Sequence, residues 1–306
     1  MNLPALRTLR QSYPKAWISL LVDKKVAGLF REHPDLDEVL AVDAAALEES
    51  GVSRRKLVHE IRKARFDLGI VSNPSKFFHW LLFSARIPVR VGWKRKWSFF
   101  LNRSLPDTKS QMTRHEIDTN LELTSLAADK KWDGALRMAV NAKASERVEA
   151  LLRPLDKAVP VVAVHAGSSN PQKMWPKERF EELCRHLLSS GRGHLVLIGG
   201  EEEMPVSQKI TSQISGPCLD LTGRLSLEEL AAFLKHPQVR TLVSSDSGPV
   251  HVAWMSGKPV VAFYAKNTAG SDPVRWGPRD GKSRTVFKSM NDITVEEVWG
   301  HVQSFL

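Results

Sequence analysis

The sequence predicts an α/β protein made of two doubly wound parallel sheets, and two observations lead to this prediction. Short apolar runs alternate with helical patterns along the whole chain of 306 residues, as they do in βαβ units. These runs form two series, separated near residues 152–160, where a helical pattern gives way to two prolines. We therefore expect an N-terminal domain at residues 1–153 and a C-terminal domain at residues 154–306 that face each other across a cleft.

Each series predicts four buried strands. The strands of the first series are expected at residues 16–22, 38–42, 66–72 and 88–93, with helices at 24–32, 54–65 and 76–85. The strands of the second series are expected at residues 159–167, 193–200, 239–245 and 258–265, again with helices between them. The amphipathic segment at 293–306 predicts a last helix, which can pack back on the first domain.

The start of the chain departs from this scheme, because it shows a helical pattern before any strand. In a doubly wound domain the first strand usually lies in the middle of the sheet and is covered on both faces. Without such a strand, the strands at 16–22 and 66–72 lose the neighbour between them, and their buried backbone groups need other partners.

The composition limits the class of protein. Basic residues exceed acidic ones by 44 to 34, and the net charge of +10 favours an anionic partner such as nucleic acid, a phosphorylated glycolipid or a membrane surface. The two cysteines, Cys184 and Cys218, have no metal-ligand spacing and fit a reducing cytosol rather than a disulfide framework. No apolar run reaches the roughly 18 residues that a membrane-spanning helix needs.

The segment VHAGSSNPQKMW at 164–175 predicts a phosphate site. A buried strand ends here, and the glycine of the following loop lets the backbone approach a ligand closely. Ser168 and Ser169 supply hydroxyl groups, and Lys173 can place a positive charge on a diphosphate without a metal. Open α/β sheets bind ligands at the carboxyl ends of their strands, which favours this interpretation over a solvated polar loop.

The segment IGGEEE at 198–203 ends a strand on two glycines and begins a helix with three glutamates. One of these three carboxylates can accept two hydrogen bonds from a ribose diol. Acids in a first helical turn also complement the helix macrodipole, and the spacing leaves both interpretations open. Ser226 and Glu229 form a capping box, which is mainly a structural feature.

The segment SSDSGPVH at 244–251 raises the question of what its polar residues do. A strand-to-helix turn needs only an N-cap such as Ser247 and tolerates a proline in the first turn, so capping does not explain Asp246 and His251. His251 lies four residues after Ser247, on the same side of the first turn. Because two polar loops follow parallel strands of one domain, we expect them to meet on one ligand.

Several other kinds of site find no support. The sequence contains no dinucleotide glycine fingerprint after a strand, no Walker A loop, no H-E-x-x-H and no nucleophile elbow, and no known nucleic-acid recognition motif. Asp35 and Asp37 stand two residues apart, but we interpret them as a solvated turn rather than a metal site. No metal site is predicted elsewhere.

The segment VGWKRKWSFFLNR at 91–103 interleaves Lys94, Arg95 and Lys96 with aromatic residues. This mixture suits an anionic amphiphile at a membrane interface, or single-stranded nucleic acid. A surface loop that covers the edge of the sheet explains the same residues equally well.

Together these segments resemble glycosyltransferase family 9, the lipopolysaccharide heptosyltransferases. The resemblance runs over nearly the whole chain. In the first half it includes LPALRTLRQSYPKAWISLLV, HPDLDEVL, RFDLGIVSNPSKFFHWLLFSARIPVRVGW and HEIDTNLELTSLAA. In the second half it includes VHAGSSNPQKMWPKERFEEL, IGGEEE, DLTGRLSLEELA and SSDSGPVHVAWMSGKPVVAFY, and the last block is the most diagnostic.

The resemblance implies a GT-B fold of two Rossmann-like domains, with the donor nucleotide-sugar in the C-terminal domain and the acceptor in the N-terminal one. It implies inverting transfer of a heptose from an ADP-heptose to the inner core of lipopolysaccharide, without metal or cofactor, on the cytoplasmic face of the inner membrane. The matching motifs give the following roles: Ser168, Ser169 and Lys173 hold the diphosphate, Glu203 faces the nucleoside, and Asp246, Ser247, Gly248 and His251 contact the donor sugar and phosphates. Lys173 and Asp246 are the candidates for catalysis, and Lys94, Arg95 and Lys96 for contact with the acceptor or the membrane.

The start of the chain differs from the family pattern. Family members begin with a strand and a Gly-Asp loop, whose aspartate is taken as the base that deprotonates the acceptor. Met1 falls inside that region, so we expect the true start to lie about 20 residues upstream. A chain that really lacks this strand is expected to aggregate and to have little or no transferase activity. Asp23 and Asp67 stand near strand ends, but the spacing favours neither of them as the base.

Two alternatives remain open at this stage. One is a catalytically impaired protein that binds a nucleotide-sugar without transferring it. The other is a family 9 enzyme with a different donor sugar or acceptor.

Overall fold

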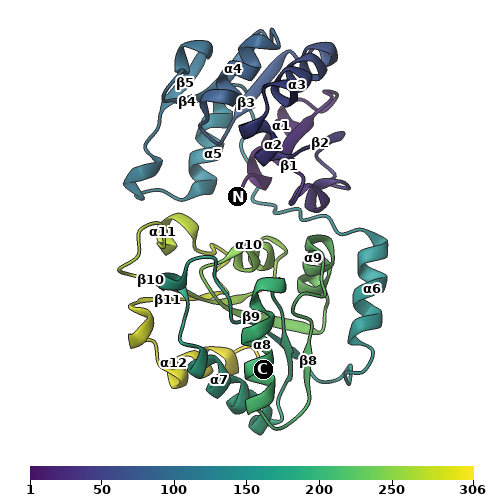
Figure 1. Cartoon of the computed structure of the whole chain (residues 1–306), viewed down its shortest axis with the longest axis vertical. Coiled ribbons are helices and arrows are strands. Elements are labelled where there is room, and N and C mark those ends of the chain that lie inside the picture. Colours follow the sequence, from purple (N-terminus) through teal and green to yellow (C-terminus); the bar gives the residue numbers. More distant parts are fainter. The chain divides into compact units, whose positions relative to one another are not determined.

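The computed structural model describes residues 1–306 and divides them into two compact units, Met1–Ala135 and Leu136–Leu306 (Figure 1). The division falls earlier in the chain than the segment 152–160, where we expected it. The difference arises from helix α6 (Ala142–Leu152), which packs against α9 (Leu227–Lys235) of the second unit. Its apolar face, with Val148 and Leu152, is buried.

The second unit contains one parallel sheet of six strands, in the order β8-β7-β6-β9-β10-β11. These strands are β6 (Val161–His165), β7 (His194–Leu197), β8 (Cys218–Asp220), β9 (Val239–Ser245), β10 (Val260–Ala265) and β11 (Arg284–Lys288). All their pairings are parallel, and the order is that of a Rossmann sheet, 3-2-1-4-5-6. The four strands predicted for this half are therefore confirmed, with β8 and β11 added at the edges.

Helices and short 3₁₀ turns connect the strands of the second unit. They are η4 (Pro171–Lys173), α7 (Lys177–Ser190), η5 (Glu201–Glu203), α8 (Met204–Gln213), α10 (Gly248–Met255), α11 (Pro273–Trp276), η6 (Met290–Asp292) and α12 (Val295–Gln303). The expected last helix is present as α12, and it packs on α7 and β10 within the same unit. Ser226 and Glu229 form the predicted capping box at the start of α9.

The first unit contains five parallel-paired strands in two separate sheets. β1 (Ser19–Asp23) pairs with β2 (Glu38–Val42), while β3 (Leu68–Val71), β4 (Val89–Lys94) and β5 (Arg103–Pro106) form the other sheet. The four strands predicted for this half are confirmed, and β1 and β3 belong to different sheets. A groove of about 1010 Å³ is lined by residues of both β1 and β3.

The helices of the first unit cover these sheets. They are α1 (Leu3–Ser12), α2 (Ala44–Glu49), α3 (Gly51–Ala64), α4 (Lys76–Ser84) and α5 (Glu116–Ser125), with the 3₁₀ turns η1 (Ala27–Phe30), η2 (Ser98–Phe100) and η3 (Lys109–Gln111). The helix expected at 24–32 is reduced to the single turn η1. Asp23 explains this, because its carboxylate accepts hydrogen bonds from the backbone N–H groups of Lys25 and Ala44 and so holds the chain in a turn.

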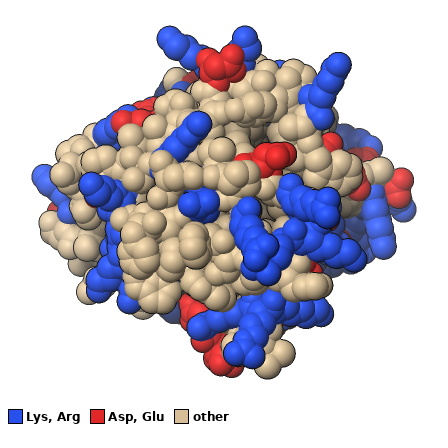
Figure 2. Space-filling model, turned by 90° about the horizontal axis from the view of Figure 1, so that it is seen from above, with Lys and Arg blue, Asp and Glu red and all other residues tan.

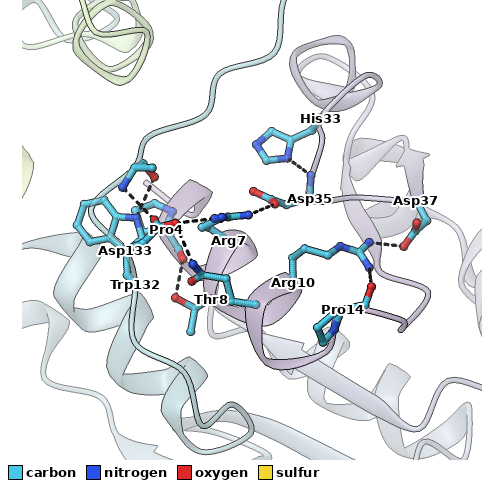
Figure 3. Close-up of polar contacts among 12 residues, drawn as sticks. Pro4, Arg7, Thr8, Arg10, Pro14, His33, Asp35, Asp37, Trp132 and Asp133 are labelled. Carbon is cyan, nitrogen blue, oxygen red and sulfur yellow. Dashed lines mark hydrogen bonds and ion pairs between the residues drawn. The ribbon is translucent and has the colours of Figure 1, made fainter.

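Helix α1 is fixed to the rest of the first unit by two arginines (Figure 3). Arg7 forms ion pairs with Asp35 at 3.1 Å and with Asp133 at 2.9 Å, and Arg10 pairs with Asp37. Asp35 is only 1% exposed, so our interpretation as a solvated turn is wrong for Asp35, whereas Asp37 is exposed. The two aspartates instead bind the helix that precedes them in the chain.

No helix of the protein is long and apolar enough to cross a bilayer.

Candidate donor site at the switch point of the second sheet

The two polar segments predicted from the sequence follow adjacent strands. β6 and β9 are neighbours at the point where the strand order of the second sheet reverses direction. The turn at 166–173 follows β6, and the turn at 246–248 follows β9. Both strands run in the same direction, so both turns lie at the same edge of the sheet. In open α/β sheets this switch point is the usual place for a ligand.

An ion pair joins the two turns. The Nζ atom of Lys173 lies 2.9 Å from Oδ2 of Asp246, and it also donates to the carbonyl oxygen of Gly270 at 3.2 Å. The Lys173 side chain is 19% exposed and the Asp246 side chain only 6%. The lysine is therefore held in place by groups from two further loops, with part of its surface still open to a ligand.

A buried histidine is hydrogen-bonded to two serines of the second polar segment. Nδ1 of His165, the last residue of β6, lies 2.9 Å from the hydroxyl oxygen of Ser244 and 3.3 Å from that of Ser247. The two hydroxyl oxygens lie 2.9 Å apart. Burial lowers the pKa of His165 to about 4, although the Glu203 carboxylate acts in the opposite direction. His165 is thus neutral near pH 7, which leaves Lys173 as the cationic side chain that joins these two turns.

The first turn of α10 is open to a ligand. Ser247 has the backbone conformation of an N-cap residue, but its side chain makes no capping hydrogen bond, because the hydroxyl group points to Ser244 and His165 instead. A side chain placed on Gly248 would meet no atom within 4 Å. Pro249, at the second helical position, carries no N–H group. An uncapped helix N-terminus with open space beside it favours an anion.

Glu203 closes the other side of the site. Its Oε2 atom accepts a hydrogen bond of 2.6 Å from the backbone N–H of Gly200. Its side chain also lies so close to the first turn that a Cβ atom at Gly167 would come within 2.3 Å of Glu203 Cγ. Gly167 is therefore required by close packing against Glu203, and this places the glutamate beside the predicted phosphate turn.

The remaining predicted residues occupy different environments. Ser168 accepts a hydrogen bond from the backbone N–H of Asn170 at 3.3 Å, and Ser169 is exposed at the tip of the turn. The His251 ring packs 5.9 Å from the ring of Trp276. Lys94, Arg95 and Lys96 are exposed on the first unit.

Three contributors to the site were not predicted. Ser244 lies in the quoted segment SSDSGPVH, but its residue type does not distinguish it from the other serines there. His165 falls within the strand predicted at 159–167, with no role of its own. Gly270 acts through its carbonyl oxygen and could not be found from residue type.

Asp23 and Asp67, the two aspartates considered as catalytic bases, lie in the first unit and not among the residues of the candidate donor site. Asp23 accepts hydrogen bonds from the backbone N–H groups of Lys25 and Ala44, which lower the pKa of its carboxyl group. Asp67 directly precedes β3 and so lies at the amino end of the sheet, opposite to the edge where ligands usually bind.

Comparison with curated proteins finds heptosyltransferases of low identity. The chain is 26% identical to lipopolysaccharide heptosyltransferase 2 of Salmonella typhimurium over 307 aligned positions, which cover 94% of this chain and 83% of that protein. It is 24% identical to lipopolysaccharide heptosyltransferase 1 of Campylobacter coli, covering 81% of this chain and 74% of the relative.

Solved structures show the same fold. The glycosyl transferase family 9 protein of Veillonella parvula has a TM-score of 0.87 at 22% identity, and the alignment covers 99% of this chain and 92% of that one. The structure of Escherichia coli ADP-heptose lps heptosyltransferase II has a TM-score of 0.80 at 22% identity, covering 99% and 93%. An E. coli heptosyltransferase solved with ADP has a TM-score of 0.76 at 19% identity, covering 100% and 95%. These neighbours confirm the predicted GT-B fold.

Residues 54–297 match the family described as glycosyltransferase family 9 (heptosyltransferase), which is 244 of the 306 residues of the chain. The match includes both turns of the candidate donor site. The chain belongs to glycosyltransferase family 9.

Proposed function

We propose that this glycosyltransferase moves a heptose from an ADP-heptose to the inner core of lipopolysaccharide, with inversion at the anomeric carbon and without a metal ion. The observation that carries the proposal is the ion pair between Lys173 and Asp246, which joins two ligand-type turns at the switch point of a Rossmann sheet. The relatives named above support heptose as the sugar. The related structure solved with ADP supports an adenine nucleotide.

The proposed reaction is a single displacement. A hydroxyl oxygen of the acceptor attacks the anomeric carbon, the bond from that carbon to the diphosphate oxygen breaks, and ADP leaves with the bonding electrons. The acceptor's proton passes to a base. Negative charge grows on the leaving diphosphate, and groups fixed in advance stabilise it most effectively.

The residues of the site would divide this work between them. Lys173 supplies positive charge to the diphosphate, and Asp246 holds the lysine in place and contacts the sugar. The first turn of α10, beginning at Gly248, directs backbone N–H groups at phosphate oxygens. Ser168, Ser169, Ser247 and His251 complete the contacts to phosphates and sugar, and Glu203 faces the nucleoside.

The acceptor side of the proposal concerns the first unit. The acceptor would be an anionic lipopolysaccharide precursor at the inner membrane surface, with the enzyme working on the cytoplasmic side as a peripheral protein. The exposed Lys94, Arg95 and Lys96 supply positive charge for such a partner.

Thermal shift and transfer assays test the proposal. ADP, UDP and GDP are compared as ligands, and ADP is expected to raise the Tm most because a ligand that binds only the folded state stabilises it by mass action. Transfer is then measured with ADP-heptose and a deacylated inner-core acceptor. Lys173→Ala should lose both the ADP shift and transfer, whereas Lys157→Ala, which removes an exposed lysine paired with Glu149, should keep both.

Each other outcome identifies an alternative. ADP binding without turnover would indicate a nucleotide-sugar-binding protein that is catalytically impaired. A larger shift with UDP or GDP would indicate a different donor. An unchanged ADP shift in Lys173→Ala would contradict the phosphate site.

A further inference from the structure

A surface of the first unit combines exposed aromatic rings with an excess of positive charge. Residues 68–106 contain seven Lys and Arg residues and no Asp or Glu. This stretch of 39 residues therefore contributes +7 to a chain whose net charge is +10. Figure 2 shows a face of the molecule on which Lys and Arg side chains gather and acidic side chains are few.

Three exposed rings surround one half-buried ring within this stretch. Phe99, Phe83 and Trp97 are 75%, 51% and 45% exposed. Their ring centroids lie 4.4, 4.9 and 6.0 Å from that of Phe100. Exposed apolar residues that occur singly need no explanation, but a contiguous cluster marks an interaction surface.

Basic side chains border these rings. The Nζ atom of Lys76 lies 5.9 Å from the Trp97 ring, and the Arg90 guanidinium lies 5.6 Å from the Phe83 ring. The exposed residues Lys94, Arg95 and Lys96 precede Trp97 directly in the chain. Arg95 pairs with Asp107 at 3.3 Å. We refer to Lys76, Phe83, Arg86, Lys94, Arg95, Lys96, Trp97 and Phe99 as the aromatic–basic surface.

The backbone holds this surface in a fixed shape. The Arg90 side chain donates to the carbonyl oxygens of Phe100 and Ile87 at 2.6 and 2.7 Å, which ties η2 to the segment between α4 and β4. Trp97 and Arg86 have φ angles of 67° and 60°. Left-handed backbone is unfavourable for such residues, so stability alone does not account for an exposed tryptophan in this conformation.

We propose that the aromatic–basic surface docks the enzyme on a lipid bilayer that contains anionic phospholipid. Aromatic rings are favourable at the level of the lipid headgroups, and neighbouring lysines and arginines are attracted to anionic lipids. Five of the seven basic residues of this stretch belong to the surface, and they provide the charge complementarity, with Arg95 alone of the five paired to an acid. The inference rests on the proposed function, because a lipid-linked acceptor requires the enzyme at that surface.

Vesicle cosedimentation of the full chain tests the docking. Vesicles of phosphatidylcholine alone are compared with vesicles that contain about 30% phosphatidylglycerol, because surface attraction depends on anionic lipid. Binding is expected only to the anionic vesicles and should weaken as salt rises from about 0.1 to about 0.5 M. The triple variant Lys94→Ser, Arg95→Ser, Lys96→Ser should bind the anionic vesicles with an affinity lower by about tenfold or more.

A matched variant controls for the loss of charge. Arg185→Ser, Arg192→Ser and Lys282→Ser together remove three exposed basic residues from the second unit and should leave vesicle binding unchanged. Phe99→Ser tests the aromatic part against Val274→Ser, since Val274 is an exposed apolar residue of the second unit. Only Phe99→Ser should weaken binding.

The outcomes separate the docking from the chemistry. Phe99→Ser should keep wild-type transfer to a water-soluble acceptor and lose transfer to the same acceptor anchored in vesicles. Equal binding of wild type and both surface variants would overturn the proposal. So would binding to a single-stranded oligonucleotide at lower concentration than to anionic vesicles, or a dimer that is lost in Phe99→Ser. Vesicle binding without any sugar transfer would uphold the docking and contradict the proposed function.

Discussion

The hydroxyl oxygen of Ser247 lies 3.3 Å from Nδ1 of His165, although Ser247 occupies the N-cap position of α10. A serine at this position normally accepts a hydrogen bond from the first turn of its helix, as Ser226 does for Glu229 at the start of α9. In α10 the hydroxyl group of Ser247 is instead hydrogen-bonded to His165 and Ser244. The arrangement leaves the helix N-terminus to a ligand and makes a buried histidine part of the site.

Acid should destabilise the protein through His165. Its folded-state pKa of about 4 lies below the ordinary value of 6.5, chiefly because the ring is buried. Between these values the unfolded chain binds a proton and the folded chain does not, so the free energy of unfolding falls as the pH is lowered from 6.5 toward 4. A shift of this size corresponds to about 3 kcal/mol. Denaturant unfolding at a series of pH values measures it.

Comparison of variants separates the destabilisation by acid that His165 causes from the destabilisation that protonated carboxylates cause. The loss between pH 6.5 and 4 should be smaller in His165→Asn, which cannot titrate. His59→Asn removes an exposed histidine and should show the same loss as wild type. Parallel curves for wild type and His165→Asn would contradict the assignment.

Removal of Lys173 should affect the empty protein as well as the ligand complex. In Lys173→Ala the Asp246 carboxylate, only 6% exposed, loses a charged partner, and the free energy of unfolding should fall by about 2 kcal/mol. ADP affinity should fall about tenfold or more, because a charged contact to phosphate is lost. Calorimetry and denaturant unfolding measure the two effects separately.

A second substitution distinguishes the two roles of the lysine. Asp246→Asn in the Lys173→Ala background removes the unpaired charge, so stability should partly recover while ADP affinity stays low. Lys157→Ala should change stability by less than about 0.5 kcal/mol, because its pair with Glu149 is exposed. Full stability in Lys173→Ala would show that the ion pair with Asp246 does not form.

The packing of Gly167 against Glu203 predicts a loss of stability in one variant that a second substitution should reverse. A Cβ atom at Gly167 would lie 2.3 Å from Cγ and 2.7 Å from Oε1 of Glu203, so Gly167→Ala should cost about 1–3 kcal/mol of stability. Glu203→Ala removes both of these atoms and should recover the loss in the double variant. Gly300→Ala, in open space on α12, should be neutral or stabilising by up to about 1 kcal/mol. Thermal unfolding of the four variants decides the question.

The strands could be predicted because buried parallel strands appear in the sequence as continuous apolar runs. β2 and β9 begin and end at the residues expected for them. Helices are harder to predict from apolar spacing than these strands. The spacing at 24–32 is that of a helix, whereas in the structure Asp23 holds the chain in a turn. A helical pattern precedes residues 152–160 in the sequence, but only tertiary packing decides that α6 belongs to the second unit.

The candidate site was predictable where residue type carries the chemistry. Lys173 and Asp246 were chosen from separate segments, and the structure brings them to 2.9 Å. Asp35 was misread because its partner, Arg7, stands 28 residues away in the sequence. His165 was passed over because a histidine at the end of an apolar run looks like any strand end. Its role depends on Ser244 and Ser247, which only the pairing of β6 with β9 brings beside it.

The open groove of the first unit leads to a prediction about stability. Its walls include the apolar residues Leu20 and Leu21 of β1 and Leu68 and Ile70 of β3. All five residues of β1 are only partly buried, whereas all five residues of β6, which has a neighbour on each side, are buried. The facing edges of β1 and β3 therefore present apolar side chains and backbone groups that one further parallel strand would cover.

An engineered N-terminal extension tests whether the groove accepts a strand. The extension consists of five apolar β-branched residues, matching the length of β1, and a loop of about two to six residues before α1. We expect the Tm to rise by about 4 °C or more, and amide exchange to slow in both β1 and β3, since the new strand would pair with each. An extension of equal length made of glycine and serine cannot bury apolar surface and should change neither quantity. Equal melting of the two extended proteins, or slower exchange in only one of the two strands, would show that the groove does not take up a central strand.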